Sequence, residues 1–266
     1  MQNKAKKPVE LVKKPIIPGS WHGKDAWKMA RKCALFVVLV TFVYLFAGML
    51  FAFDGWWRIL VSGAIVAGAG YYLYMTGAVQ GQNDAAYGEI LYNRRAEGHA
   101  VPEDECARSF HPFKGFFAVL MGAAPFVLFA LVFAFMTEET VYRLGTLPVW
   151  TESLMDQTEF ADGLQYYNVQ SGLQAVDFMR IIDRVMIMPF INAAMPYGSK
   201  AVLLMERLSP VLLLIAPMGY GIGYAEGLLL RAKINTGIKM GDDKKIRKER
   251  KARKQRQRSK APERLI

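Results

Sequence analysis

Three long runs of uncharged, mostly apolar residues constrain this chain more than any other feature. They are Cys33–Phe53, Ile59–Val79 and Gly115–Met136, and none of them contains a charged side chain. A helix rises about 1.5 Å per residue, so about 20 apolar residues cross a hydrocarbon core roughly 30 Å thick. Buried helices of soluble domains are usually shorter and polar on one side. Each run is therefore predicted to be a transmembrane helix.

A fourth crossing is predicted at 201–230. Its apolar part, Leu208–Leu230, contains one charged residue, Glu226. Pro210 and Pro217 are expected to kink this helix, as Pro125 is expected to kink the third, because proline removes a backbone hydrogen bond inside a helix.

The overall composition agrees with a membrane protein. Hydrophobic residues make up 53% of the chain and aromatic residues 12%, which is high for a soluble protein of 266 residues. The first apolar run is longer than the apolar region of a cleaved signal peptide, about 7–15 residues, so we expect it to be retained as an anchor. The two cysteines, Cys33 and Cys106, are too few for a disulfide framework.

The charges flanking the apolar runs predict the orientation. Residues 1–32 carry nine Lys or Arg against two acids, and residues 231–266 carry fifteen against four. Residues 137–184 carry eight acids and three arginines. Because Lys and Arg beside membrane helices stay in the cytoplasm, both termini are predicted to be cytoplasmic. An even number of crossings is then required, and four satisfy it.

The predicted fold is an all-α polytopic membrane protein with four transmembrane helices and an additional interfacial amphipathic helix. We expect it in a bacterial plasma membrane, with Asp54–Arg58 as a short external turn. The predicted segments, in chain order, are a basic cytoplasmic segment at 1–32, a transmembrane hairpin at 33–79 (33–53 and 59–79), a cytoplasmic helical loop at 80–114, the third span at 115–136, an external segment at 137–200, the fourth span at 201–230 and a basic cytoplasmic tail at 231–266.

The interfacial helix is expected near 171–188, within the external segment. Asp177, Arg180 and Arg184 recur there at helical spacing and define one narrow polar strip, while apolar residues occupy the rest of the surface. This pattern is typical of a helix that turns its polar strip to water and its apolar faces to lipid or to other helices. The stretch 181–199 is interpreted as lying in or dipping into the membrane surface.

The cytoplasmic loop contains potential ligands and titratable groups without a diagnostic pattern. His99, Cys106 and His111 match none of the paired spacings of zinc sites, so no metal site is predicted. Two short helices are expected, at 84–95 and after Pro102, with Gly98 ending the first in a left-handed conformation. No nucleotide-binding or nucleophile motif occurs, so neither a cofactor nor a catalytic residue is assigned.

The basic tail is the clearest candidate for a binding segment. Residues 244–260 contain eleven basic residues, one acid and no aromatic residue. Because anionic head groups attract such segments by about 1 kcal/mol per cation, membrane lipids are the first expected partner. Ribosomal RNA or another acidic partner, such as a protein, comes second, with nucleic acid limited to non-specific RNA contact. A purely solvated tail comes third. The residues assigned to binding are Lys244, Lys245, Arg247, Lys248, Arg250, Lys251, Arg253 and Lys254.

A glycine-rich stretch, MGYGIGYAEGLLLR at 218–231, admits three interpretations. A phosphate loop needs a strand-to-helix turn, and a potassium filter needs Thr-Val before Gly-Tyr-Gly; both are missing. Spacing favours a helix, because small residues four apart let helix backbones approach in lipid. The predicted packing residues are Gly219, Gly223 and Gly227, with a mate in the second span at Gly63, Ala67 and Gly68.

Glu226 lies on the same stretch and is the candidate ion or proton site. A carboxylate in a membrane helix is costly and usually faces a bundle interior or water. Glu226 is five residues before Arg231, about one turn from the expected inner surface. Three interpretations stay open: a carboxylate at the boundary water, a proton or cation site, and a polar contact between helices.

These patterns predict a non-enzymatic scaffold or accessory subunit, held together by the glycine face and engaging lipids, a protein partner or a second copy of itself. The alternative is a transport or channel component that uses Glu226. A third hypothesis is a membrane enzyme with its site on the cytoplasmic loop.

Overall fold

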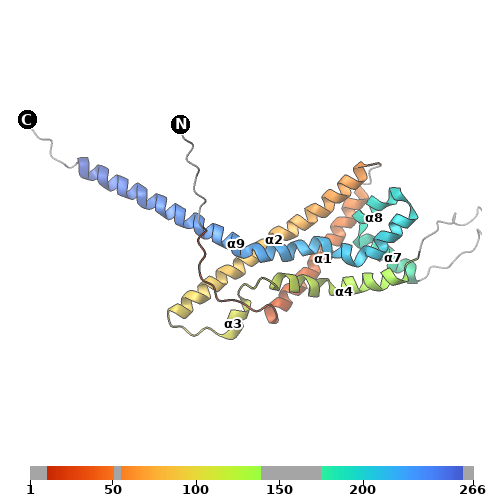
Figure 1. The fold of residues 1–266 in the computed structure, drawn as a ribbon, viewed down its shortest axis with the longest axis horizontal. Coiled ribbons are helices and arrows are strands. Elements are labelled where there is room, and N and C mark those ends of the chain that lie inside the picture. Colours follow the sequence, from red (N-terminus) through yellow and green to blue (C-terminus); the bar gives the residue numbers. More distant parts are fainter. Residues whose placement is uncertain (1–10, 51–54, 139–174, 260–266) are drawn as a thin grey trace, which may run out of the picture. The chain divides into compact units, whose positions relative to one another are not determined.

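The structure, a computed structural model, describes residues 11–50, 55–138 and 175–259, with side chains to residue 255. All of the regular secondary structure in these residues is helical (Figure 1). The helices are α1 (Lys24–Leu50), α2 (Trp57–Ala96), α3 (Glu103–Arg108), α4 (Lys114–Met136), α7 (Ala175–Met186), α8 (Met188–Ala194), the short 3₁₀ helix η2 (Met195–Tyr197) and α9 (Ser199–Ser259).

Four of these helices, α1, α2, α4 and α9, are long and apolar enough to cross a membrane. They coincide with the four apolar runs of the sequence, which confirms the predicted all-α class and the number of candidate spans. α4 begins and ends within one residue of the predicted 115–136. The other three are longer than their apolar runs, because helix-forming polar residues continue them.

Two extensions change the predicted segmentation. α2 has 40 residues and includes the stretch 84–95 that was expected to be a separate short helix; it ends before Gly98, which has φ of 86°. α9 has 61 residues and passes without interruption through Pro210 and Pro217 into the basic tail. Because 40 residues make a helix about 60 Å long, α2 exceeds a hydrocarbon core of roughly 30 Å by about the same length again.

The chain folds as two compact units that share the long helices. The first unit comprises Met1–Ala26, Tyr74–Phe117 and Gly221–Ile266, and the second comprises Trp27–Leu73 and Ala118–Tyr220. In the second unit α1, α4, α7 and α9 meet in a small apolar core, with Val37, Ala123, Met186 and Leu213 at its centre.

The interfacial orientation expected for α7 is not confirmed. α7 lies within the predicted 171–188, but Arg180 and Arg184 of its polar strip reach the buried Glu206 of α9, whereas the side chain of Asp177 is 40% exposed. Its other exposed residues are apolar, including Phe178 and Ile181. The sequence pattern identified the strip correctly but could not show that a buried carboxylate faces it. The acidic stretch 139–174 lies outside the described residues.

Candidate functional sites in the two units

The glycines of α9 lie where its backbone approaches that of α2. In the second unit a methyl group added to Gly219 would overlap the carbonyl oxygen of Gly70, and in the first unit one added to Gly223 would overlap the carbonyl oxygen of Tyr74. Gly227 is in the same position against Gly81. All three contacts involve backbone atoms, which cannot rotate away as a side chain can. Only glycine therefore permits this separation between the helices.

The mate of these glycines in α2 differs from the expected one. Gly63 and Gly68 are exposed, and a methyl group on either would meet no atom within 4 Å. Gly63 and Ala67 instead border a groove of about 450 Å³ in the second unit, opposite Phe190 of α8. α2 is longer than its apolar run, so α9 meets it nearer its carboxyl end, at residues 70–81.

Glu226 is exposed in the first unit and accepts a hydrogen bond from the hydroxyl of Tyr74. The contact joins α9 to α2 one residue before the Gly227 approach. Of the three interpretations, the polar contact between helices has a direct structural counterpart.

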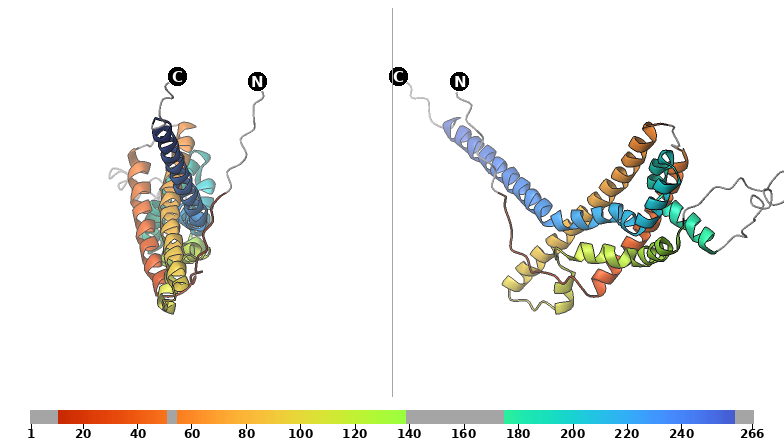
Figure 2. Two further views of the ribbon diagram at one scale, coloured as in Figure 1. Left: turned by 90° about the vertical axis from the view of Figure 1, so that its left-hand side faces the viewer. Right: turned by 45° about the vertical axis from the view of Figure 1, so that its right-hand side comes forward.

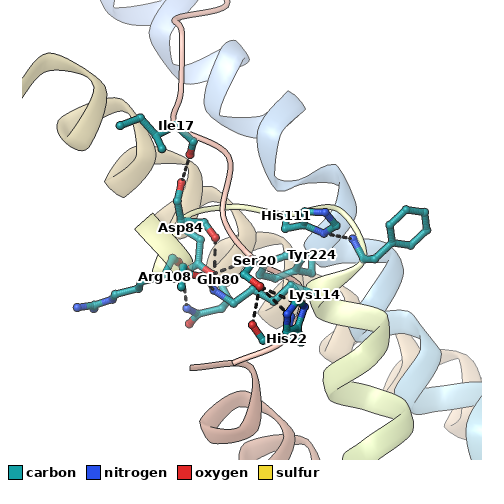
Figure 3. Close-up of polar contacts among 12 residues, drawn as sticks. Ile17, Ser20, His22, Gln80, Asp84, Arg108, His111, Lys114 and Tyr224 are labelled. Carbon is teal, nitrogen blue, oxygen red and sulfur yellow. Dashed lines mark hydrogen bonds and ion pairs between the residues drawn. The ribbon is translucent and has the colours of Figure 1, made fainter. Parts of the chain in front are cut away.

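A buried ion pair stands at the centre of the first unit. Asp84 of α2 lies 3.5 Å from the ammonium nitrogen of Lys114, whose side chain is 1% exposed (Figure 3). The hydroxyl of Tyr224 donates to Asp84 Oδ2 at 2.6 Å, and Gln80 Nε2 donates to Oδ1 at 2.9 Å. Both carboxylate oxygens therefore have donors. We call Asp84, Lys114, Tyr224 and Gln80 the Asp84 cluster.

The ammonium group of Lys114 also holds the end of the loop that contains α3. It donates to the backbone carbonyls of Ala107, Arg108 and Ser109, at 3.4, 2.9 and 3.4 Å. The ring of Tyr224 stacks on Phe110 from the same loop, with ring centroids 5.4 Å apart. These contacts give the Asp84 cluster a structural role, because they connect α2, α4, α9 and the loop through one set of satisfied groups.

The N-terminal segment lies across this loop. The carbonyl of Ile17 accepts a hydrogen bond from the hydroxyl of Ser109 (Figure 3). The amide of Gly19 donates to the carbonyl of Phe110 at 2.9 Å. A methyl group on Gly19 would overlap the carbonyl of Ser109, so glycine is required at this crossing. The residues from about 16 to 20 are thus a fixed part of the first unit.

The potential ligands of the loop do not converge. Among the described residues no group of three or more His, Cys, Asp or Glu side chains could hold a metal ion. Cys33 and Cys106 are both free thiols. Burial lowers the pKa of His111, and the nearby charge of Lys114 adds to this effect, so the ring is neutral at pH 7.

A second polar contact fixes the start of the basic part of α9. Arg231 Nη2 lies 2.7 Å from Glu89 Oε2 of α2, and Asn235 Nδ2 donates to Glu89 Oε1 at 2.7 Å. One residue later, Thr236 accepts a hydrogen bond from the amide of Val12 at 2.9 Å. From residue 237 to residue 255 every side chain is exposed. We call residues 237–259 the basic extension; it runs away from the other elements of its unit (Figure 2).

The second unit contains another buried carboxylate, Glu206 of α9, which is 1% exposed. Arg184 donates to Glu206 Oε1 from Nε at 2.7 Å and approaches it from Nη2 at 2.6 Å. Thr137, just after α4, donates to Oε2 at 2.7 Å, and Arg180 Nε lies 3.5 Å from the same oxygen. We call Glu206, Arg180, Arg184, Thr137 and Asp183 the Glu206 cluster.

Asp183 differs from every other carboxylate described. It is fully buried, and neither of its oxygens has a hydrogen-bond partner among the described residues. The pKa of Asp183 is raised to about 7, chiefly by burial and to a lesser degree by the charge of Glu206, while the hydroxyl of Ser209 and the charge of Arg184 lower it. A buried carboxylate without donors is strongly disfavoured in its charged form.

A cavity of about 390 Å³ adjoins the Glu206 cluster. Arg184 and Glu206 form its charged side, and mostly apolar residues of α8, η2 and the first turns of α9 form the rest. Buried charge beside a cavity is the usual signature of a functional site, although ion pairs that only stabilise a fold share it.

In a comparison with known proteins, no family model, no curated protein and no solved structure matches the chain. Sequence reasoning missed both clusters. Asp84, Lys114 and Glu206 lie at or just beyond the ends of apolar runs, where charged residues usually mark only the end of a span. Asp183 gave a signal, since an acid within an apolar stretch is costly.

Proposed function

We propose that this chain is an integral membrane protein with both termini in the cytoplasm, acting as a non-enzymatic scaffold or accessory subunit through its basic extension. A bacterial plasma membrane fits its four long apolar helices. The observation that carries the proposal is the continuity of α9, which runs from the fourth candidate span to Ser259 as one helix.

Several contacts support a presenting role for the extension. The hydrogen bonds of Glu89 and Val12 fix α9 as far as Thr236. Beyond that point the helix continues for 23 residues to Ser259, a length of about 35 Å at 1.5 Å per residue. This length is several times the Debye length of about 8 Å, the distance over which salt screens the charge of the head groups. A helix that keeps the direction of its span therefore presents most of its charge to a partner away from the head groups.

The charge pattern supports the same conclusion. The cations at 244, 245, 247, 248, 250, 251, 253 and 254 are distributed around the whole helix, because successive residues are about 100° apart. A helix that lies in the membrane plane needs an apolar face, and the extension has none. The basic extension therefore binds phosphate or carboxylate groups by charge alone. Anionic lipids provide the former and an acidic protein the latter.

A sedimentation experiment tests this binding. The full chain in nanodiscs of phosphatidylcholine is mixed with vesicles of phosphatidylcholine or phosphatidylglycerol. We expect sedimentation with the anionic vesicles only and its loss at high salt. Replacing Arg247, Lys248, Arg250 and Lys251 by Gln should weaken binding by about 100-fold or more, since each cation contributes roughly 1 kcal/mol near such a surface.

The matched control exchanges Lys and Arg at the same four positions and keeps the charge. It should bind as the native protein does. Equal binding to neutral vesicles, or equal loss in the charge-keeping variant, would contradict a role for charge. A protein that co-purifies with the native chain in mild detergent, and is lost with the Gln variant, would identify the partner of the scaffold.

Transport is the second candidate, because the Glu206 cluster places buried charges beside a cavity. Glu226 enters this alternative as the candidate ion or proton site, hydrogen-bonded by Tyr74. The two functions differ in liposomes: a scaffold moves no ion or solute, and Glu226→Gln leaves its assembly intact. Flux through the purified protein that Glu226→Gln or Glu206→Gln abolishes would favour transport.

A further inference from the structure

We propose that Asp183 is a proton-binding site, at which the second unit takes up and releases one proton near neutral pH. The proposal goes beyond the scaffold function and does not depend on the basic extension. It rests on the difference between Asp183 and the other buried acids among the described residues, Asp84, Glu89 and Glu206, all of which have hydrogen-bond donors.

The first step is the lack of any donor. Both oxygens of Asp183 are buried and unpartnered among the described residues, as is the hydroxyl of Ser209, which faces it from α9. A carboxylate and a hydroxyl would ordinarily pair, with the hydroxyl donating. In this structure the two groups make no hydrogen bond, and the nearby hydroxyl of Ser209 lowers the pKa of Asp183 by less than burial raises it. The neutral acid is thus the favoured form at this buried site.

The second step concerns the charges around Asp183. Glu206 faces it from α9 and opposes a second negative charge, whereas Arg184 on its own helix already donates to Glu206. Arg180, one turn earlier, contacts Glu206, Thr137 and the backbone of Glu138 at the end of α4. α8 carries no charged residue, and neither does α1 after Lys32 nor α4 after Lys114. The cations near Asp183 are therefore engaged by Glu206.

The third step is the exchange of the proton with solvent. Glu206 and Arg184 line the cavity, and the charges of both act on Asp183. A proton from solvent in the cavity converts the carboxylate of Asp183 to the acid and raises the charge of the cluster by one. When the proton leaves, two carboxylates compete for Arg184, and the Arg184–Glu206 contact between α7 and α9 weakens. Proton release is thus linked to the packing of these two helices.

Infrared difference spectroscopy of the full chain in lipid tests the proposal. Between pH 6 and pH 8.5 ordinary carboxyl groups are ionised, so we expect one C=O stretch of a protonated acid that fades with a midpoint near 7. Asp183→Asn should lack this band. The matched control is Asp177→Asn, which removes an acid from the same helix whose side chain is 40% exposed and should keep the band.

A further variant guards against a folding defect in Asp183→Asn. Ser209→Ala removes the neighbouring hydroxyl but leaves the acid, so the band should remain and change its frequency. Absence of the band at pH 6 in the native chain would overturn the proposal. So would a band that persists unchanged in Asp183→Asn, or one that is insensitive to Ser209→Ala and equally reduced in Asp177→Asn.

Discussion

Each unit buries an aspartate between helices, and the two aspartates differ in whether their oxygens accept hydrogen bonds. Asp84 in the first unit accepts hydrogen bonds from Tyr224 and Gln80 and pairs with the ammonium group of Lys114. Asp183 in the second unit has no donor in the described part of the chain, although two arginines lie on its own helix. Burial alone therefore does not indicate function. A buried charge whose hydrogen bonds are all made connects parts of a fold. A buried carboxyl group without donors can instead bind or release a proton.

The largest effect is expected from removing the cation of the first unit. Lys114→Met leaves Asp84 without its counter-ion and removes the hydrogen bonds that the ammonium group donates to three carbonyl groups. Breaking a buried pair costs about 3–5 kcal/mol of unfolding free energy, and this variant should lie at the upper end. Denaturant unfolding in detergent micelles measures it.

The control for that measurement is Lys233→Met, which removes an exposed lysine of the same unit and should change stability by less than about 0.5 kcal/mol. Equal losses in the two variants would show that the Asp84 cluster does not hold the first unit together.

The second effect is a dependence of stability on pH that originates in the second unit. The pKa of Asp183 is about 7 in the folded chain against 3.8 for an ordinary aspartate, so the folded state binds a proton that the unfolded state has lost. This contribution is complete below about pH 4 and is lost as the pH rises through 7. Between pH 5 and pH 7 the loss is roughly 2 kcal/mol, because the slope of about 1.4 kcal/mol per pH unit falls to half of that value at pH 7.

Thermal unfolding of the native chain and of Asp183→Asn across this range checks the effect. The native chain should lose stability as the pH rises, and the variant should show a smaller change. Parallel curves for the two proteins would assign the pH dependence to other groups and would remove the contrast between the units.

The third test asks whether the helix contacts are alike in the two units, so that only the charge clusters differ. Gly219→Ala in the second unit and Gly223→Ala in the first both push a methyl group against the backbone of α2. Each should cost about 1–3 kcal/mol, the usual range for overpacking. Gly68→Ala, which meets no atom within 4 Å, is the control and should be neutral or slightly stabilising. A loss in only one unit would show that the glycine face matters locally.

The smallest effect is expected at Glu226, the acid that the sequence singled out. It is exposed, and Gln can still accept the hydrogen bond of Tyr74. Glu226→Gln should therefore change the unfolding free energy by less than about 0.5 kcal/mol at pH 7. A loss of several kcal/mol of unfolding free energy would show that Glu226 behaves as a buried carboxylate does, and would weaken the distinction between Asp84 and Asp183.

The sequence predicted what depends on long apolar runs and little of what depends on contacts between them. The four candidate spans followed from the lengths of uncharged segments, and the end of α2 before Gly98 followed from a local preference for left-handed glycine. The glycine spacing at 219–227 indicated a close helix contact, but its mate requires the register of two helices, which no local pattern contains.

The functional groups show the same limit. Glu206 was invisible as a site because it precedes an apolar run, where acids are common, and its importance arises only from two arginines on α7. The polar strip of α7 was recognised from its period, yet its direction depended on that distant carboxylate. Asp183 is an acid in an apolar stretch, which the sequence shows, but only the structure shows that no described residue donates a hydrogen bond to it.

The contrast between the two units is tested most directly by the sign of two matched substitutions. Asp84→Asn and Asp183→Asn both replace a buried carboxylate by its neutral isostere, and their unfolding free energies are compared with that of the native chain at pH 8. Asp84→Asn should destabilise the protein by about 1–3 kcal/mol, because an amide offers fewer acceptors to three donors. Asp183→Asn should stabilise it, because the variant no longer buries an unpaired charge. A similar loss of unfolding free energy in both variants would contradict the proposed difference between Asp84 and Asp183.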